Sequence, residues 1–241
     1  MTHPLQPQPA TVRTEVMVPL CFSDGFTTNA RVLTFDGLVD GREHLAVGLG
    51  DRTSRLAPAD RLDRAPLVRL HSECLTGDVF GSQRCDCGPQ MREAVERITE
   101  AGGYLLYLRQ EGRGIGLYGK LDAYALQDVG LDTYEANLAL GFRADARDYT
   151  AAAQMIHALG IPGVALLSNN PDKAEQLARH GVPVRQRVPT GIHRTPANAR
   201  YLATKALRGA HAFDPPPLSE VQDVDAGGPV PERDDDLRLE A

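Results

Sequence analysis

Three of the four cysteines lie close together, in the stretch LHSECLTGDVFGSQRCDCG. Cys74, Cys85 and Cys87 are spaced C-x10-C-x-C, and clustered thiolates in a reducing compartment favour zinc over other ions. Three protein ligands leave a fourth position for water, which is typical of a catalytic zinc site. A fourth protein ligand, for which Cys21 and His71 are candidates, would instead close the site and make it structural. Spacing alone slightly favours the structural alternative.

The polar residues just before the first clustered cysteine favour the catalytic alternative. Arg69, His71 and Glu73 alternate along the chain, so in an extended segment they share one face. A purely structural metal site has no need of a cation and a carboxylate directed together beside its metal. Cys21 lies far upstream in the apolar run VPLCF, where a buried core cysteine is expected.

A glycine-rich loop, RQEGRGIGLYGK, follows the apolar run YLLYL. Gly114, Gly116 and Gly119 match G-x-G-x-x-G, but a dinucleotide-binding loop has its glycines directly after the strand. Its acidic partner is also missing, because Glu135 lies in TYEANLAL, a poor strand end. We interpret the segment as an arginine-bearing loop that begins a helix and offers backbone N–H groups to phosphate. A solvated turn is an equally open alternative.

Two more polar clusters precede predicted helices. In SNNPDKAEQL, a helix is expected to begin at Asn170, with Lys173 in its first turn. A lysine is unfavourable beside a positive helix terminus unless an anion is present, which suggests a second phosphate contact. A lysine extended into water is the plainer alternative. In GFRADARDYT, Asp145 and Arg147 lie in a loop before a helix, and an ordinary helix N-terminus explains their spacing equally well.

The strands and helices that position these residues are predicted from the spacing of apolar residues, which changes along the chain. Short apolar runs separated by Gly, Asp and Pro predict strands over 15–22, 29–35, 44–49 and 66–70. Pro89 fits the first position of a helix with Met91, Val95 and Ile98 on one face. Further strands are expected over 104–108, 164–167 and 182–188, and further helices over 117–128, 148–159, 170–180 and 198–207. The predicted fold is mixed α/β, with a β-rich N-terminal portion followed by strand–helix units in one compact domain.

Composition limits the classes of protein to consider. Hydrophobic residues make up 42% and charged residues 24% of the 241 residues, as in an ordinary globular protein. The net charge of −6 gives no general reason to expect a nucleic-acid partner, and no apolar run reaches the length of a membrane span. Without a hydrophobic leader, a cytoplasmic protein is expected. We expect a flexible lead over residues 1–11, the main domain over 12–212, and a disordered, acidic, proline-rich tail over 213–241.

The motifs together resemble the GTP cyclohydrolase II family, which starts riboflavin synthesis. The resemblance extends over about residues 66–211, and more loosely upstream to residue 12. It rests on RLHSECLTGDVFGSQRCDCGPQ, LRQEGRGIGL, AYALQD, DTYEAN and SNNPDK, in that order. It implies a GTP cyclohydrolase II-like fold, a homodimer, and an enzyme that opens the guanine imidazole ring of GTP. The implied products are formate, pyrophosphate and 2,5-diamino-6-(5-phosphoribosylamino)pyrimidin-4(3H)-one.

The resemblance also implies roles for individual residues. The three clustered cysteines would hold one zinc per subunit, whose water attacks C8 of the base. Tyr124, which its apolar neighbours alone predict to be a core residue, would act in ring opening and deformylation. Arg147 would attack the α-phosphate, with Asp145 as base. Because a guanidinium stays protonated, stabilisation of phosphate charge by Arg147 remains an alternative.

The remaining implied positions contact GTP, with magnesium bound to its triphosphate. They are Arg69, His71, Ser72, Glu73, Gln90, Glu111, Gly112, Arg113, Thr133, Ser168 and Lys173. Ser168 stands where a threonine is expected in the family, and it keeps the hydroxyl group.

Three alternatives to the full reaction stay open. The first is an enzyme that opens the ring but retains the formyl group, against which Tyr124 argues. The second is a zinc-stabilised GTP sensor without turnover, which the presence of every ligand and reactive position disfavours. The third is a structural zinc protein, which the two phosphate-type helix starts disfavour.

Overall fold

The computed structural model describes residues 9–51, 65–143, 145–199 and 202. Its strands are β1 (Thr11–Cys21), β2 (Thr27–Asp36), β3 (Leu45–Leu49), β4 (Leu67–Ser72), β5 (Gly103–Leu108), β6 (Val164–Leu167) and β7 (Val184–Val188). Its α-helices are α2 (Leu75–Asp78), α3 (Cys87–Ala101), α4 (Leu117–Asp128), α5 (Thr133–Ala139), α6 (Thr150–Ala158) and α7 (Pro171–Arg179). Two 3-10 turns, η2 (Glu111–Gly114) and η3 (Pro196–Asn198), complete the described elements.

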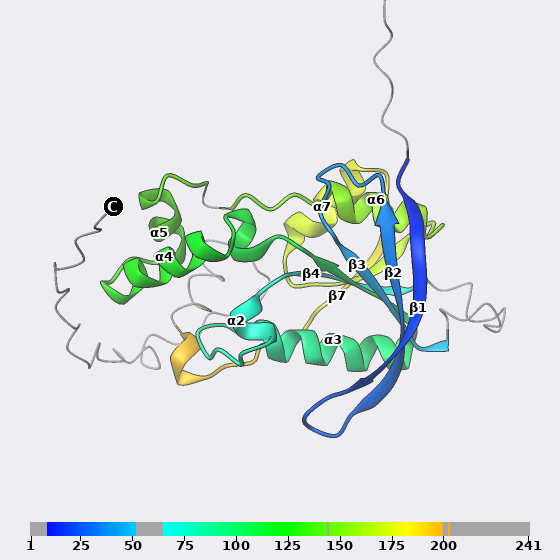
Figure 1. The fold of residues 1–241 in the computed structure, drawn as a ribbon, viewed down its shortest axis with the longest axis horizontal. Coiled ribbons are helices and arrows are strands. Elements are labelled where there is room, and N and C mark those ends of the chain that lie inside the picture. The colour runs from blue at the N-terminus through cyan, green and yellow to red at the C-terminus, as the bar shows by residue number, and fades with distance from the viewer. Residues whose placement is uncertain (1–8, 52–64, 144, 200–201, 203–241) are drawn as a thin grey trace, which may run out of the picture.

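All seven strands belong to one mixed sheet, in the order β1-β2-β3-β5-β4-β6-β7 (Figure 1). The pairs β1–β2, β2–β3 and β3–β5 are antiparallel. The pairs β5–β4, β4–β6 and β6–β7 are parallel. Strand β5 joins the two halves, because Gly103 pairs with Leu49 on one side and with Leu67 on the other. The predicted mixed α/β fold, with strands first and strand–helix units after, is confirmed.

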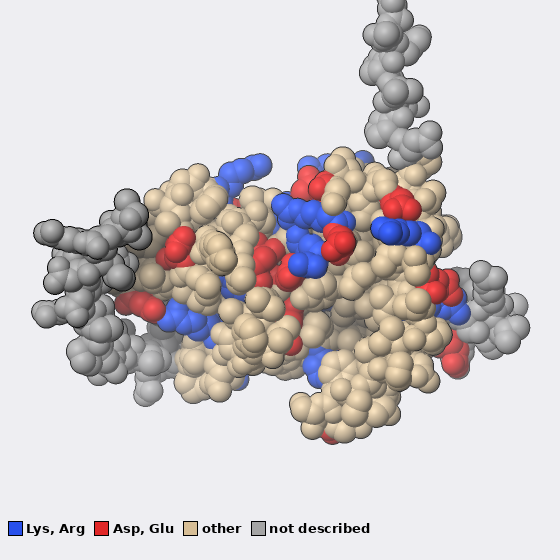
Figure 2. Space-filling view, in the orientation of Figure 1, with Lys and Arg blue, Asp and Glu red and all other residues tan. Residues whose placement is uncertain are grey.

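The first two strands form a long hairpin that extends beyond the rest of the sheet (Figure 1). On the face shown in Figure 2, the projecting end of this hairpin is mostly free of charged side chains. Strand β1 lies at the edge of the sheet and is exposed along most of its length. Cys21, at its end, is exposed. The prediction of a buried core cysteine is therefore wrong. Side chains alternate between the two faces of a strand, so Leu20 and Phe22 pack against the cluster that contains Val95 and Ile98, whereas Cys21 points to the opposite, exposed face.

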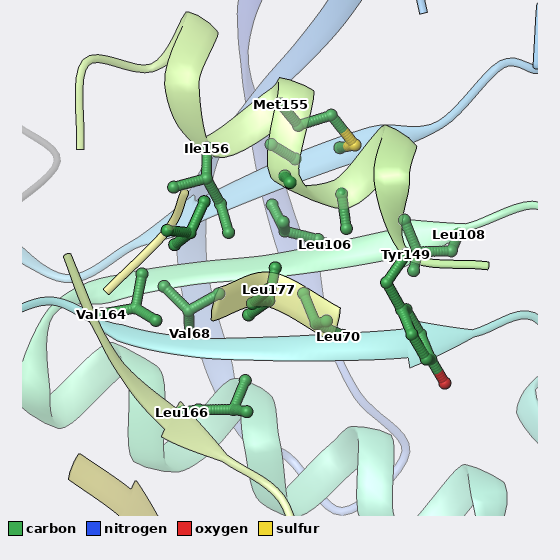
Figure 3. Close-up of a cluster of buried hydrophobic side chains, with 14 of the residues drawn as sticks. Val68, Leu70, Leu106, Leu108, Tyr149, Met155, Ile156, Val164, Leu166 and Leu177 are labelled. Carbon is green, nitrogen blue, oxygen red and sulfur yellow. The ribbon is translucent and has the colours of Figure 1, made fainter. Parts of the chain in front are cut away.

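Helices cover both faces of the central strands (Figure 1). On one face, α3 buries Val95 and Ile98 in a cluster with side chains of β3, β4, β5 and β6. On the other face, α6 places Met155 and Ile156 over Leu106 (Figure 3). Burying an aliphatic side chain of this size contributes about 1.5–3 kcal/mol, so both clusters hold the sheet rigid. No described helix is long and apolar enough to cross a membrane.

The predicted helices and strands within the described residues are present, with shifts at their ends. Helix α3 begins at Cys87 instead of Pro89. The N–H groups of a helix's first turn have no acceptor within the helix, so a proline, which lacks this N–H, fits any position of that turn. Helix α5 was not predicted, although Asp132 and Glu135 form a capping box at its start. Most of the helix expected over 198–207 lies outside the described residues. The domain limits stay predictions.

The chain after β7 is attached to α3 through one carboxylate. Glu93 accepts hydrogen bonds from the Gly191 N–H (3.0 Å), the Thr190 hydroxyl (3.1 Å) and Arg97 (2.7 Å). His193 Nε2 lies 3.0 Å from the same carboxylate. Burial opposes the charge, but these partners outweigh it and lower the pKa of Glu93 to about 2. Glu93 therefore holds the segment that follows β7 against α3.

We predict that Glu93→Gln lowers the free energy of unfolding at neutral pH and flattens its dependence on acid pH. A carboxylate with a lowered pKa stabilises the fold above its unfolded pKa, near 4.5, and this stabilisation is lost as the pH falls toward about 2. Urea unfolding of both proteins across this range measures the difference. Glu96→Gln, on the same helix, is the matched control and should retain the wild-type slope. Parallel wild-type and Glu93→Gln curves would contradict the prediction.

Candidate active site

The site lies where three parallel strands end. Strands β4, β5 and β6 run in the same direction, so the chain leaves all three at one edge of the sheet. Ligands commonly bind at this edge in parallel sheets. The segments that follow these strands line one pocket, together with α4, α5 and the beginnings of α3 and α7.

This pocket brings together all but one of the residues predicted for the site. Its lining includes Arg69, His71, Ser72, Glu73, Cys74, Cys85, Cys87, Gln90, Glu111, Gly112, Arg113, Tyr124, Thr133, Arg147, Ser168 and Lys173. Asp145 is not among the lining residues, but its carboxylate is paired with Arg147, which is.

The three cysteine sulfurs form a compact cluster in the pocket wall. They lie within 4.8 Å of one another, and the sulfurs of Cys74 and Cys85 are 3.6 Å apart. Cys74 is the residue before α2, while Cys87 begins α3. No other His, Cys, Asp or Glu among the described residues joins this group. Cys21 lies exposed on the sheet edge, and His71 Nε2 contacts Asp78, so neither candidate closes the cluster.

The surroundings of the sulfurs fit a thiolate-bound metal. At Gly77, a Cβ atom would lie 2.8 Å from the Cys85 sulfur and 3.0 Å from that of Cys74. The absence of a side chain there gives the sulfurs their space. Hydrogen bonds from the neighbouring thiols, together with the ammonium of Lys120, lower the pKa of Cys74 well below its usual range. Three soft donors, at least one of them readily ionised, suit zinc.

A buried network lies beside the cluster. Asp78 accepts hydrogen bonds from the backbone N–H of Cys74 and the hydroxyl of Tyr107, both at 3.0 Å, and contacts His71 Nε2 at the same distance. Burial lowers the pKa of His71 although Asp78 opposes the shift. A neutral imidazole that donates from Nε2 to Asp78 leaves Nδ1 as an acceptor. This atom has no hydrogen-bond partner among the described residues.

Positive charge dominates the rest of the pocket. The lining cations are Arg69, Arg113, Lys120, Arg147 and Lys173, and the lining carboxylates are Glu73 and Glu111. Both carboxylates are paired, Glu73 with Arg109 (2.8 Å) and Glu111 with Lys120 (2.8 Å). The chain as a whole has a net charge of −6. The pocket is therefore a local positive region in an acidic protein, which favours an anionic ligand.

Two of these guanidinium groups keep a buried donor without an acceptor among the described residues: Nε of Arg69 and one terminal nitrogen of Arg113. Arg69 donates its other nitrogens to Gln90 (2.7 Å) and to the Leu167 carbonyl (3.3 Å). Arg113 lies over the ring of Tyr134, 4.5 Å from its centroid. An unsatisfied buried donor is costly, and an anion bound in the pocket would satisfy it.

The glycine-rich loop has an unusual backbone at the pocket. Gly112 and Arg113 are both left-handed, with φ of 60° and 61°. Arg113 is the only non-glycine residue with positive φ in the described part of the chain, and such strain concentrates at functional sites. The predicted helix start is confirmed, since α4 follows at Leu117.

Four predicted residues, Arg147, Asp145, Tyr124 and Lys173, differ in their surroundings. Arg147 Nε donates to the Asp145 carboxylate (2.9 Å), and a second nitrogen also pairs with it. Burial would raise the pKa of Asp145, but Arg147 outweighs it and lowers the pKa. The Asp145 carboxylate is therefore a weaker base than usual. Burial raises the pKa of Tyr124, which keeps its hydroxyl protonated. Lys173 Nζ donates to the Leu70 carbonyl (2.7 Å).

Several pocket residues were missed by the sequence analysis, including Lys120, Gln127, Asn137, Asn169, Asn170 and Thr190. Asn169 and Thr190 bind each other through two hydrogen bonds, of 2.8 and 3.1 Å, and so connect the ends of β6 and β7. Only tertiary structure brings these two together. Lys120 could have been predicted from the sequence, because it lies one helical turn before Tyr124 and therefore on the same face of α4.

The sequence is similar to known proteins over most of its length. A family model described as GTP cyclohydrolase II matches residues 19–189. The chain belongs to the GTP cyclohydrolase II family. A protein of Vibrio parahaemolyticus named GTP cyclohydrolase-2 is 50% identical over 82% of this chain and 97% of its own length. The protein of that name from Vibrio cholerae is 49% identical with the same coverage. Relatives of this similarity support an enzyme of the GTP cyclohydrolase II type.

A third relative has a different name and length. The riboflavin biosynthesis protein RibBA of Bacillus velezensis is 50% identical over 75% of this chain, but the match covers only 44% of the RibBA protein. The similarity to this longer protein is thus confined to less than half of it.

We predict that Gly77→Ala weakens zinc binding by about tenfold or more, because the new methyl group must displace two of the sulfurs. Gly77 is helical, so alanine suits its backbone and the effect is steric. Competition with a chromophoric chelator measures the affinity. Gly119→Ala, on α4, is the matched control, because its methyl group would meet the ring of Phe142, which is partly exposed and free to shift. Unchanged affinity in Gly77→Ala would contradict the close contact.

Proposed function

We propose that this enzyme is a zinc-dependent GTP cyclohydrolase II that acts in riboflavin biosynthesis. Its products would be formate, pyrophosphate and 2,5-diamino-6-(5-phosphoribosylamino)pyrimidin-4(3H)-one. The observation that carries the proposal is that three clustered cysteine sulfurs and two unsatisfied guanidinium donors line the same pocket. The names of the relatives support the reaction and the pathway.

The three cysteines are the proposed zinc ligands. Zinc bound there would supply a Lewis acid that makes a coordinated water molecule more acidic. The residues around it have separate tasks. Asp78 holds both His71 and the backbone of Cys74 in place, and the Tyr124 hydroxyl, kept protonated by burial, is a proton donor for ring opening and deformylation.

Three of the lining cations are the proposed triphosphate site. Arg69, Arg113 and Lys173 come from three different segments, so a single anion held by all three would be fixed in position. Gln90, Thr133 and Ser168 line the same pocket and are proposed polar contacts to GTP. Magnesium would enter with the triphosphate, because both lining carboxylates are already paired and the ion binds mainly through phosphate oxygens.

We assign Arg147 the stabilisation of charge at the α-phosphate. Its guanidinium is held by the carboxylate of Asp145, an arrangement that favours a fixed cation. To act as a nucleophile, a nitrogen of Arg147 would have to lose a proton, but the ion pair with Asp145 stabilises the protonated guanidinium. In this assignment Asp145 orients Arg147 and is not the base.

A homodimer remains part of the proposal. Among the described residues, strand β1 is an edge of the sheet with β2 as its one neighbour, and its side chains Val16 and Met17 are 49% and 62% exposed. Long exposed edges with apolar side chains usually have a partner in the assembled protein. A cytoplasmic location stays a prediction from the sequence.

We predict that purified protein incubated with GTP and magnesium releases formate and pyrophosphate and forms the deformylated pyrimidine monophosphate. Mass spectrometry of the products, alongside zinc quantification, measures this. Cys85→Ser removes one of three ligands, and it should lose zinc and release no formate. A product that retains the formyl group would restrict the reaction to ring opening. Unchanged GTP beside bound zinc would indicate a sensor instead of an enzyme.

We predict that Arg147→Ala lowers the rate of pyrophosphate release by about 10²–10³-fold, as expected for loss of one charge-stabilising group. Arg147→Lys should retain part of the rate, because it keeps the charge. Arg187→Ala changes an exposed arginine on β7 that shares no pocket with Arg147 or Asp145, and it is the control. A guanylyl adduct on the wild-type enzyme, detected by intact-mass analysis during turnover, would contradict the assignment and support a nucleophile.

A further inference from the structure

A buried lysine contacts the metal cluster, and the proposed function gives it no role. Lys120, on α4, is 8% exposed, and its ammonium lies 3.1 Å from the Cys74 sulfur. The same ammonium donates to the Thr76 hydroxyl (3.0 Å) and to Glu111 (2.8 Å). An ammonium group has three donors, and all three have partners here. The lysine is thus fixed in place, with one of its three bonds directed at a metal ligand.

The charge of Lys120 suits a metal held by three thiolates. A divalent ion with three thiolates has a net charge of −1, and the buried carboxylate of Glu111 adds another negative charge nearby. Buried charge is costly unless it is paired. The ammonium contacts both Cys74 and Glu111 and lowers the net negative charge of this region from −2 to −1. A hydrogen bond to a ligand sulfur also fixes its orientation and adjusts its donation to the metal.

The same residue connects the metal cluster to the helix of Tyr124. Lys120 and Tyr124 lie one turn apart on one face of α4, and the ammonium is 5.7 Å from the centre of the tyrosine ring. Glu111 extends the connection, since its other oxygen accepts from the backbone N–H of Leu75, at 2.6 Å, beside Cys74. Lys120 and Glu111 therefore connect three segments: the turn at Cys74 and Leu75, the turn after β5, and helix α4.

We propose that Lys120 is a positioning residue of the metal site, which orients the Cys74 sulfur as a ligand and sets the place of Tyr124 relative to the metal. The proposal rests on the zinc site proposed above. It goes beyond that site because it assigns to a residue of α4 a share in metal affinity and in the alignment of the proton donor.

The test is Lys120→Met in protein loaded with zinc or cobalt. Zinc affinity, from competition with a chromophoric chelator, should fall by about 10–100-fold, as is typical when a hydrogen-bond partner of a ligand is lost. The thiolate-to-cobalt charge-transfer band in the near ultraviolet should shift, a change that a merely structural role would not produce. In formate release, kcat should fall while the KM for GTP changes little. Lys120→Arg should restore part of the affinity.

Two further variants make the result decisive. Lys173→Met removes another buried lysine of the pocket, one that contacts the Leu70 carbonyl, and should leave zinc affinity and the cobalt band unchanged. If Lys120→Met does not fold, Lys120→Met/Glu111→Gln removes both buried charges and should show the same loss. Wild-type affinity and band in a folded Lys120 variant would overturn this proposal alone. Wild-type protein that binds no zinc would overturn the proposed metal site and this proposal with it.

Discussion

The close parallel pairing of β4 with β5 is the constraint on which the site depends. A Cβ atom at Gly103 would lie 1.9 Å from the Leu67 carbonyl oxygen, so only glycine allows the two backbones to approach this closely. The pairing continues from Gly103 to Leu108 and fixes where both strands end. The segments that carry the clustered cysteines and the glycine-rich loop leave the sheet at the same level for this reason.

Electrostatic balance is the second organising feature. The pocket collects cations from β4, the turn after β5, α4, the loop before α6 and α7, but it pairs most of them with nearby acceptors. Asp145 holds Arg147, Glu111 holds Lys120, and Gln90 holds Arg69. Groups fixed in this way need little reorganisation when charge develops, which is the condition for electrostatic catalysis.

The sequence allowed much of this to be predicted, for identifiable reasons. Cysteine spacing predicted the sulfur cluster because only the short helix α2 and the turn after it separate Cys74 from Cys85 and Cys87, and periodicity predicted the helices that cover the sheet. The strand order was not predictable, because β5 inserts between β3 and β4 only in three dimensions. Lys120 was overlooked since a helical lysine is usually solvated. Cys21 was misplaced since an uninterrupted apolar run does not show which of its alternating side chains face the core.

The order of the strands also has a consequence for how the enzyme is made. Leu67 pairs with Ala165, and the bond from Lys173 to the Leu70 carbonyl spans 103 residues of chain. Contacts this distant in sequence form late, because a long loop must close first. During synthesis, the turn that carries the clustered cysteines leaves the ribosome well before the strand and helix that complete the pocket. The three thiols are therefore present in the growing chain before the pocket around them can form.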